Sequence, residues 1–374
     1  MIKRNDFPKA ERIVVKIGSS LLTDGGRGLN KQAITGWVEQ IANICLGNKD
    51  ILLVSSGSVA EGISRLGLKQ RPNTLHELQA AASVGQMGLI KTFEDCFQKH
   101  NLHAAQVLLT HDDLSNRQRY LNARNTLLAL LGFNTIPVIN ENDAVATEEI
   151  RFGDNDTLAA LVANLIGADL LIILTDQEGL MDSNPNINPD AQLISKALTN
   201  DPSLDKVAGD STSGLGRGGM LTKIQAARLA ARSGTATIIA SGNESNIIKR
   251  IISGEEIGTF LVPNIDPIAA RKQWLAGQLK IRGQLVLDNG AVNKLQNAGK
   301  SLLAVGVKSV SGQFSRGDLV TCFSNSGIEI ARGLINYNSE ESKKIIGKPS
   351  ADFEALLGYA DNAELIHRDN LVLI

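Results

Sequence analysis

Four short apolar runs in the chain each end in a cluster of small polar or charged residues. Runs of about four to eight apolar residues, rich in Val and Ile and bounded by turn formers, are typical of strands buried on both faces of a parallel sheet. In an open sheet of this kind the ligand binds outside the carboxyl ends of the strands. The pattern therefore predicts a binding site built by the residues that follow the runs at 13–17 (IVVKI, then GSS), 51–54 (ILLV, then SSGS), 136–139 (IPVI, then NEND) and 170–174 (LLIIL, then TDQEG).

Segments with helical character separate these predicted strands. Residues 31–46 carry apolar side chains at helical spacing, and residues 76–97 have helical character despite several glycines. Residues 158–166 place apolar side chains at i, i+3, i+4, i+7 and i+8. With further strands at 104–109 and 236–240, the alternation predicts an α/β fold, a three-layer αβα sandwich around a mainly parallel sheet.

The pattern changes after Pro263. Short β-like pieces follow, separated by Gly, Asn, Ser and Asp, which indicates a small β-rich domain. We therefore expect a first domain at residues 1–265, a linker at 266–276 and a second domain at 277–374. The β-like pieces are residues 284–288, 301–307, 318–323, 328–333 and 370–374.

Composition narrows the class of protein. The chain has 374 residues, enough for two or three domains, and its net charge of −1 argues against a strongly basic nucleic-acid binder. The three cysteines, Cys45, Cys96 and Cys322, have no metal-ligand spacing, and an odd number gives no disulfide framework. The polar N-terminus is no signal peptide, and no apolar run approaches the ~20 residues that span a bilayer. We expect a soluble cytoplasmic protein without membrane contact.

Lys16 lies near the end of an otherwise apolar predicted strand. A buried lysine is costly unless its ammonium group emerges at the end of the sheet or meets an anion. A phosphate group would supply that anion, and backbone N–H groups of the following GSS loop could bind the same ligand. The alternative is an edge strand with a solvated lysine.

The segment SGLGRGGMLTK, residues 213–223, contains a literal GxGxxG at Gly214, Gly216 and Gly219. It follows no apolar strand and no acidic residue stands about 20 positions later, so it fails the context of a dinucleotide-binding fingerprint. It also lacks the ending of a P-loop. The remaining interpretation is a mobile loop that opens a helix, with Lys223 in the first turn, where free N–H groups attract phosphate. The alternative is a flexible surface loop.

Three consecutive polar residues, Asp154, Asn155 and Asp156, stand at a predicted helix start. Asp and Asn are favoured as helix caps, but one cap needs only one such residue. If Asp156 lies between Lys16 and Lys223, its carboxylate can hold both ammonium groups in place for a phosphate.

Polar groups after the other strands suit a ligand that bears both an ammonium and a carboxylate, such as an amino acid. Loop solvation and an Asx-type turn are the alternatives for these groups. The five histidines have no metal-ligand spacing and form no evident catalytic triad. The polar groups are Asn140, Glu141, Asn142 and Asp143, then Ser55, Ser56 and Gly57, and the nucleotide-contacting candidates Thr175 and Asp176.

These residues resemble the amino acid kinase family, most closely its members that phosphorylate L-glutamate at the start of proline biosynthesis. The similarity covers nearly the whole chain, and the C-terminal segment resembles a PUA domain, a small β-barrel-like module often found in RNA-modifying enzymes. The matching motifs, in order, are VVKIGSSLLT, VSSGSVAEG, LLTHDDL, LNARNTL, PVINENDAVAT, GDNDTLAALVA, LTDQEGL, AGDSTSGLGRGGMLTK and GVKSVSGQFSRGD.

The resemblance implies a role for each candidate residue. Lys16 and Lys223 act on the ATP phosphates, and Asp156 orients the two lysines. Arg217 stands where some relatives have a small polar residue, with no expected change of chemistry because the loop acts largely through its backbone. The implied glutamate-binding residues are Ser56, Asp143 and Asn155, and the implied nucleotide-binding residues are Lys16, Thr175, Asp176, Arg217, Gly218, Gly219, Met220, Leu221, Thr222 and Lys223.

The resemblance also implies the reaction and the partners. The γ-phosphoryl group of ATP passes to the side-chain carboxylate of L-glutamate, with Mg²⁺ held mainly by the ATP phosphates and no metal site in the protein itself. Inhibition by proline and a homo-oligomer, dimer or tetramer, are further implications. The alternatives are another family specificity (N-acetylglutamate, aspartate, carbamate or UMP) and an RNA-binding role of the C-terminal domain.

Overall fold

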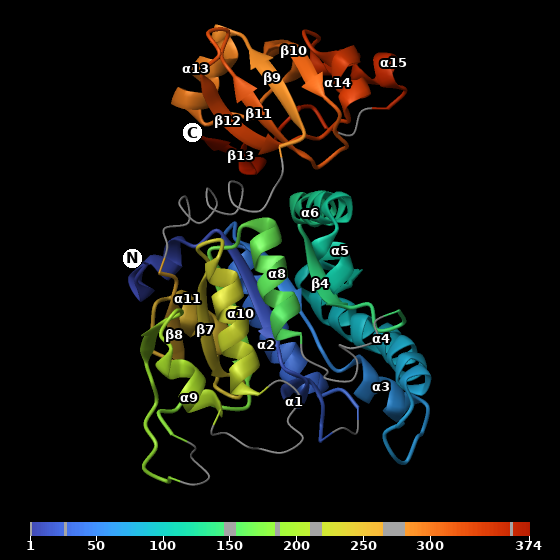
Figure 1. Cartoon of the computed structure of the whole chain (residues 1–374). Helices are drawn as coiled ribbons and strands as arrows, with labels where there is room; N and C mark the ends of the chain where they lie inside the picture. The colour runs from blue at the N-terminus through green and yellow to red at the C-terminus, as the bar shows by residue number, and fades with distance from the viewer. Residues whose placement is uncertain are drawn as a thin grey trace. The chain divides into compact units, whose positions relative to one another are not determined.

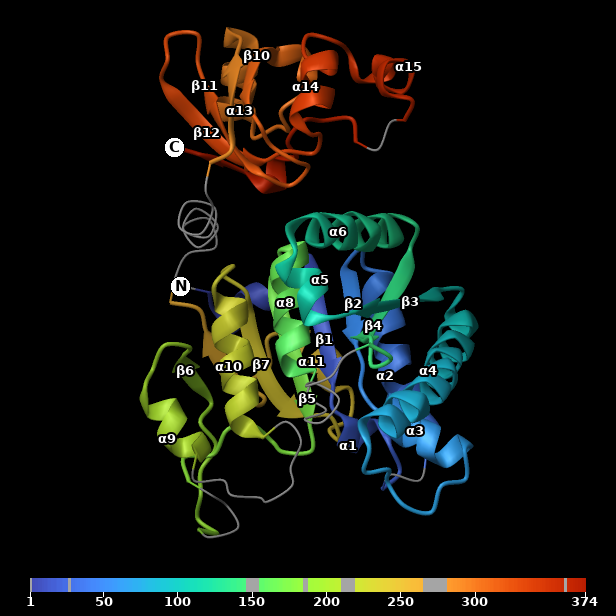
Figure 2. The same ribbon diagram turned by 45° about the vertical axis from the view of Figure 1, so that its right-hand side comes forward.

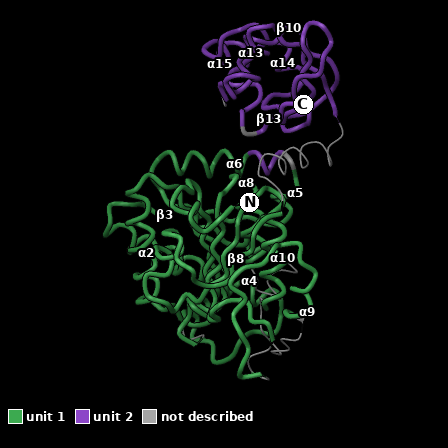
Figure 3. The backbone as a smooth tube through the Cα atoms, turned by 90° about the vertical axis from the view of Figure 1, so that its left-hand side faces the viewer, with its two compact units in different colours: residues 1–116, 122–267 green, residues 117–121, 268–374 purple. Residues whose placement is uncertain are grey.

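The computed structural model describes residues 2–25, 28–145, 155–183, 188–209, 219–264, 281–359 and 362–374. The chain divides into two compact units, one of residues 1–116 with 122–267 and one of residues 117–121 with 268–374 (Figure 3). The predicted linker at residues 266–276 lies outside the described residues.

The first unit, coloured from blue to yellow along the chain in Figure 1, is built on an eight-stranded sheet. The strand order is β3-β4-β2-β1-β5-β7-β8-β6. Neighbouring strands run parallel except for β7 and β8, which pair antiparallel. The prediction of a mainly parallel sheet is confirmed. The strands are β1 (Arg12–Ile17), β2 (Asp50–Val54), β3 (His103–Leu109), β4 (Thr135–Glu141), β5 (Leu170–Thr175), β6 (Lys196–Leu198), β7 (Ala236–Ser241) and β8 (Thr259–Val262).

Helices cover both faces of this sheet (Figure 2). Ile13, Val15 and Ile17 of β1 belong to a core cluster with residues of α2, α4 and α11. Because side chains alternate along a strand, Lys16 lies on the opposite face, the face covered by α8 and α10. The helices of this part of the chain are α1 (Ser19–Leu22), α2 (Lys31–Cys45), α3 (Ser58–Arg65), α4 (Leu75–Phe97), α5 (His111–Ser115), α6 (Arg117–Gly132), α8 (Asp156–Ile166), α9 (Ser203–Gly209), α10 (Met220–Ala231) and α11 (Ile247–Ile252).

The glycines within α4 are explained by its contact with α3. A Cβ atom on Gly85 of α4 would lie 1.8 Å from the carbonyl oxygen of Ser58, and one on Gly62 of α3 would lie 1.7 Å from that of Ala81. Real Cβ atoms do not approach a backbone oxygen so closely, so both positions need glycine. The predicted helix at residues 76–97 is therefore confirmed, and its glycines permit the backbones of two helices to touch.

We expect Gly85→Ala to lower the free energy of unfolding by about 3 kcal/mol, because the methyl group must push α3 away from α4. Gly36→Ala is the matched control, since Gly36 lies inside α2 and a Cβ there meets no atom within 4 Å. That substitution should raise the free energy of unfolding by about 0.5–1 kcal/mol. Urea denaturation of the two variants checks the difference, and equal midpoints would show that the contact between α3 and α4 is loose.

Arg4 makes several of the contacts that hold the N-terminal segment against the sheet. Arg4, the first residue of the 3₁₀ helix Arg4–Lys9, lies with its guanidinium carbon 5.6 Å from the centroid of the Phe260 ring in β8. Its two terminal nitrogens donate to four backbone carbonyl groups, which ties β6 and the turn before β8 to the N-terminus. The acceptors are Glu255 (3.1 Å), Ile257 (2.8 Å), Ser195 (3.1 Å) and Gly258 (3.0 Å).

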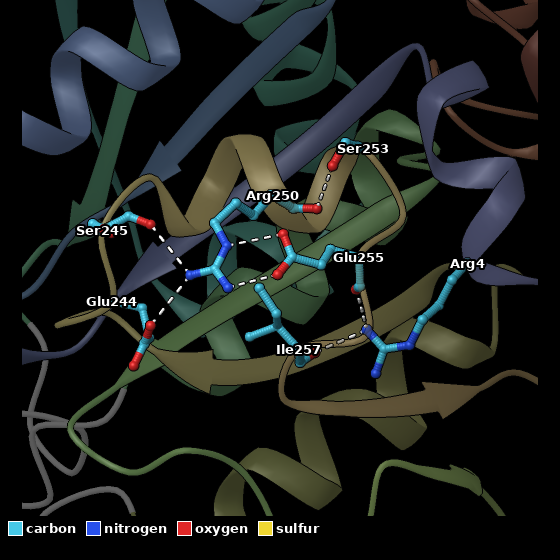
Figure 4. A network of polar contacts seen from close by, with 7 residues as sticks. All are labelled: Arg4, Glu244, Ser245, Arg250, Ser253, Glu255 and Ile257. Carbon is cyan, nitrogen blue, oxygen red and sulfur yellow. Dashed lines mark hydrogen bonds and ion pairs between the residues drawn. The ribbon is translucent and has the colours of Figure 1, made fainter.

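A second arginine orders the same turn (Figure 4). Arg250 of α11 donates two hydrogen bonds to the Glu255 carboxylate, at 2.9 and 2.6 Å, and a third to Glu244 at 3.2 Å. The hydrogen bonds from Arg250 lower the pKa of Glu255. The short strands β6, at the edge of the sheet, and β8, next to it, thus lie beside contacts made from outside the sheet.

The second unit contains a five-stranded sheet with the order β10-β9-β11-β12-β13. The β-rich character predicted for this segment is confirmed, and the described residues add helices to the strands. The elements are β9 (Gly283–Leu287), α13 (Asn289–Ala298), β10 (Val307–Gly312), β11 (Leu319–Phe323), β12 (Glu329–Leu334), α14 (Ser339–Ile345), α15 (Phe353–Leu357) and β13 (Leu371–Leu373).

One predicted strand of this unit is wrong. Of the predicted residues 301–307, Leu302 forms an isolated bridge with Ile366 and Ala304–Gly306 form a 3₁₀ turn, and only Val307 belongs to a strand, as the first residue of β10. Leu302 and Ala304 are buried in the core of the unit, which explains the apolar run. A short apolar run reports burial and does not by itself distinguish a strand from a turn.

Within the described ranges, no helix combines the length and the apolar character needed to cross a membrane.

Candidate active site

The strand order brings the predicted polar groups to one place. The strands β4, β2, β1 and β5 are consecutive neighbours and parallel, so their carboxyl ends lie side by side. The strands that follow β1 in the chain, β2 to β4, lie on one side of it, and β5 lies on its other side. Such a reversal of strand order is where α/β sheets bind ligands.

Two lysines meet on one aspartate at this end of the sheet. The Nζ atom of Lys16, from β1, lies 2.5 Å from Oδ1 of Asp156, the first residue of α8, and Nζ of Lys223, from α10, lies 3.0 Å from Oδ2. The side chain of Asp156 is fully buried, and those of Lys16 and Lys223 are 4% and 7% exposed. The hydroxyl oxygen of Thr222 lies 3.2 Å from Oδ2 of Asp156.

The charges of this triad do not cancel. Two ammonium groups share one carboxylate, so the three side chains together carry one net positive charge. Positive charge held in a buried place attracts an anionic ligand such as a phosphate. The alternative of a solvated lysine on an edge strand is wrong, because β1 lies in the interior of the sheet and Lys16 is buried.

The capping interpretation fails for Asn155. Asn155 occupies the N-cap position of α8, but its side chain makes no capping hydrogen bond. Its Nδ2 atom instead donates to the carbonyl oxygen of Ser55 at 2.5 Å and to Oδ1 of Asn140 at 2.6 Å. Asn155 thus ties the end of β2 to the end of β4. Asp154 lies outside the described residues.

A buried glutamine that the sequence interpretation missed extends this network. Nδ2 of Asn140 donates to Oε1 of Gln86 at 2.7 Å, and Oδ1 of Asn140 accepts from the backbone N–H of Glu141 at 2.9 Å. Gln86 lies in the middle of α4, one residue after Gly85 and three before the buried Leu89. A polar residue at a core position of a helix was the signal that could have found it.

Two further predicted substrate residues lie after β2 and β4. The Oγ atom of Ser56 is buried and has no hydrogen-bond partner among the described residues. Asp143 follows β4 and accepts a hydrogen bond from Oγ of Ser58 at 2.8 Å, so α3 and the loop after β4 are joined.

The predicted nucleotide-binding residues lie on the other side of β1. Thr175 ends β5 and donates from Oγ1 to Oδ1 of the exposed Asp176 at 3.0 Å. Gly219 is the N-cap of α10, and Oγ1 of Thr222 donates to its carbonyl oxygen at 2.7 Å. Lys223 lies in the next position of the helix. Met220 is buried and Leu221 is 37% exposed, whereas Arg217 and Gly218 lie outside the described residues.

The sequence matches known protein families over most of its length. The model of the amino acid kinase family matches residues 11–241, and that of the PUA domain matches residues 283–357. The glutamate 5-kinase of Methylococcus capsulatus is 62% identical over 373 residues, covering 100% of both chains. Those of Thioalkalivibrio sulfidiphilus and Hydrogenovibrio crunogenus are 59% identical over 371 residues, covering 99% of each chain, and 56% identical over 374 residues, covering 100%. The chain therefore belongs to the amino acid kinase family, in its glutamate 5-kinase branch with a C-terminal PUA domain.

Proposed function

We propose that this protein transfers the γ-phosphoryl group of ATP to the side-chain carboxylate of L-glutamate, which gives L-glutamyl 5-phosphate and ADP, the first step of proline biosynthesis. The observation that carries the proposal is the buried arrangement of Lys16, Asp156 and Lys223 beside an amide network at the same end of the sheet. The full-length identity to glutamate 5-kinases supports it independently.

The chemistry needs little from the protein beyond position and charge. A side-chain carboxylate is already ionised at neutral pH, so no general base is required. Catalysis then depends on alignment of the acceptor oxygen with the γ-phosphorus and on neutralisation of the charge on the phosphoryl oxygens. Lys16 and Lys223 supply positive charge. Asp156 holds both ammonium groups and does not take up a proton.

The proposal includes Mg²⁺ bound together with ATP. Mg²⁺ usually keeps several water ligands and takes substrate phosphates as the others, so its main ligands would come from the nucleotide. Among the described residues no three His, Cys, Asp or Glu side chains are grouped as a metal site, and the proposal requires none. The ion would supply further charge neutralisation at the transferred group.

The ligands divide between the two sides of β1. We assign glutamate to the side of β2 and β4, where the unpartnered hydroxyl of Ser56 can donate to a carboxylate. ATP lies on the side of β5 and α10. The assigned glutamate residues are Ser56, Asp143 and Asn155, and the assigned nucleotide residues are Lys16, Thr175, Asp176 and residues 217–223.

Asp143→Ala is expected to raise the KM for glutamate about tenfold or more, with a smaller change in kcat, because a carboxylate that binds the substrate ammonium group would be lost. Initial rates at varied glutamate and saturating ATP check this. Asp95→Ala is the matched control, since Asp95 is exposed on α4 and forms a surface ion pair with Lys91 at 3.2 Å. An unchanged KM in Asp143→Ala would remove Asp143 from the glutamate site.

The function itself is tested with purified protein, ATP, Mg²⁺, L-glutamate and hydroxylamine, which traps the acyl phosphate as γ-glutamyl hydroxamate. We expect hydroxamate that depends on both ATP and glutamate. A parallel screen that couples ADP release to a dye, with N-acetylglutamate, aspartate, carbamate and UMP as acceptors, separates the other family specificities. Faster turnover of any of these acceptors would overturn the assignment to glutamate.

The family resemblance adds two further features to the proposal, inhibition by proline and assembly into a homo-oligomer. Proline is an inhibitor that competes with glutamate, and the protein is a homo-oligomer built through the kinase domain. Addition of proline at subsaturating glutamate tests the first, and light scattering in solution tests the second.

A further inference from the structure

The amide group of Gln86 has a fixed orientation, and backbone groups set it. Oδ1 of Asn140 faces the backbone N–H of Glu141, so the other end of this amide, Nδ2, must be the one that meets Gln86. Gln86 can accept that hydrogen bond only through Oε1. Nε2 of Gln86 therefore points away from Asn140.

A second backbone anchor gives the same orientation. Nδ2 of Asn155 donates to the carbonyl oxygen of Ser55, which can only accept, and the same nitrogen reaches Oδ1 of Asn140. The directions of the hydrogen bonds thus agree from Ser55 to Gln86. Exchange of oxygen and nitrogen in any one amide would place two donors or two acceptors face to face.

The remaining donor of this network is unused. Gln86 is 7% exposed, and its Nε2 atom has no hydrogen-bond partner among the described residues. A buried N–H group without a partner costs about 1–3 kcal/mol relative to one that is satisfied, so such groups are rare without a reason. The Oγ atom of Ser56, next to the Ser55 carbonyl of the same network, is a second buried donor in this state.

The position of Gln86 indicates which end of the substrate it would contact. Asn140, the partner of Gln86, lies near the end of β4, and β2 separates β4 from β1, so these two strands lie roughly 10 Å apart. The lysines mark the place of phosphoryl transfer. The end of the substrate that does not react must extend from there toward β4, and an N–H donor there suits a carboxylate and not an ammonium group.

We infer that Gln86 is a substrate-binding residue whose Nε2 atom donates a hydrogen bond to the α-carboxylate of the bound amino acid, an inference that rests on the proposed function. Asn140 and Asn155 are positioning residues that hold the Gln86 amide in the required orientation. The site thereby selects an acceptor with a free α-carboxylate as well as a reactive side-chain carboxylate.

Gln86→Glu tests the donor alone, because the new carboxylate keeps an acceptor for Asn140 and replaces Nε2 by oxygen. We expect the KM for L-glutamate to rise roughly 10- to 100-fold, the range for a hydrogen bond to a charged group, while kcat and the KM for ATP change little. L-Isoglutamine, which has a neutral α-amide and an intact side-chain carboxylate, provides the sharper readout. Its amide can donate to the new carboxylate, so the ratio of kcat/KM for glutamate to that for isoglutamine should fall at least tenfold.

Gln40→Glu is the matched control. Gln40 is a buried glutamine of α2 whose Nε2 donates to Gly36 and whose Oε1 accepts from the N–H of Ile248, away from the candidate site. If a buried carboxylate has only a general effect, kcat/KM for glutamate and kcat/KM for isoglutamine should fall by the same factor. The ratio of the two would then stay unchanged in Gln86→Glu and in Gln40→Glu. If Gln86→Glu does not fold, Gln86→Met keeps the length of the side chain and removes the donor. The same ratio should fall, because the charged α-carboxylate of glutamate loses a stronger hydrogen bond than the neutral α-amide of isoglutamine.

The outcomes separate the two proposals. Wild-type protein that forms no hydroxamate from glutamate overturns the proposed function. Active wild-type protein together with an unchanged substrate ratio in both Gln86 variants overturns the role of Gln86 and leaves the function in place.

Discussion

Lys16→Met and Lys223→Met are each expected to lower kcat by about 10³-fold or more, with a much smaller change in the KM for glutamate. Methionine keeps most of the length of the lysine stem and removes only the ammonium group. Both ammonium groups lie within 3.0 Å of Asp156, so each variant leaves the other lysine in place but with half of the positive charge removed. The loss appears in kcat because the charge on the phosphoryl oxygens is stabilised mainly in the transition state.

Steady-state kinetics with both substrates varied, by coupled ADP detection, measures this effect. Lys249→Met is the matched control, since Lys249 is an exposed lysine of the short helix α11. The double variant of Lys16 and Lys223 should be less impaired than the product of the single effects, because residues that act as a unit are not additive. Turnover within tenfold of wild type in either single variant would remove that lysine from the chemistry.

Asp156→Asn is expected to lower the free energy of unfolding by about 3–5 kcal/mol and to lower kcat as well. The reason is that breaking a buried ion pair leaves charge without compensation, and here two ammonium groups lose one carboxylate. The asparagine has nearly the same shape, so packing changes little. The lysines would then repel each other at short range and lose the geometry needed for the phosphate.

Urea denaturation and kinetics on the same preparation check both effects. Asp205→Asn provides the control, because Asp205 pairs with Arg228 at 2.7 Å in a half-exposed position, where an ion pair is worth about 0–1 kcal/mol. Wild-type stability of Asp156→Asn would mean that the lysines do not depend on the aspartate. In that case the positive charge of the site would have another source of compensation.

The strands that build the site were predictable from their own residues. The apolar runs that became β1, β2, β4 and β5 are buried throughout or nearly so, and each is followed by the polar groups that line the site. The edge strand β6 and its neighbour β8 were missed. They contain three and four residues, and they are held by contacts such as those of Arg4, which come from far along the chain.

The candidate site was predictable in its residue types and only in part in its contacts. Lys16, Asp156 and Lys223 could be named from their places at strand and helix ends, and the structure brings all three together. The capping preference of Asn155 gave no indication that its side chain turns toward Ser55 and Asn140. Gln86 was not predicted because the residues around it in α4, AAASVGQMGLI, are mostly small or apolar and form no recognisable motif.

Local sequence was sufficient for the buried parallel strands, the polar groups after them and the change to a β-rich second unit, because hydrophobic periodicity and turn chemistry act over a few residues. The meeting of two lysines on one carboxylate, the close crossing of α3 and α4 and the orientation of the Gln86 amide depend on the folded arrangement. Each of these joins atoms from elements distant in the chain, and only the packing of those elements sets the distances and the hydrogen-bond directions between them.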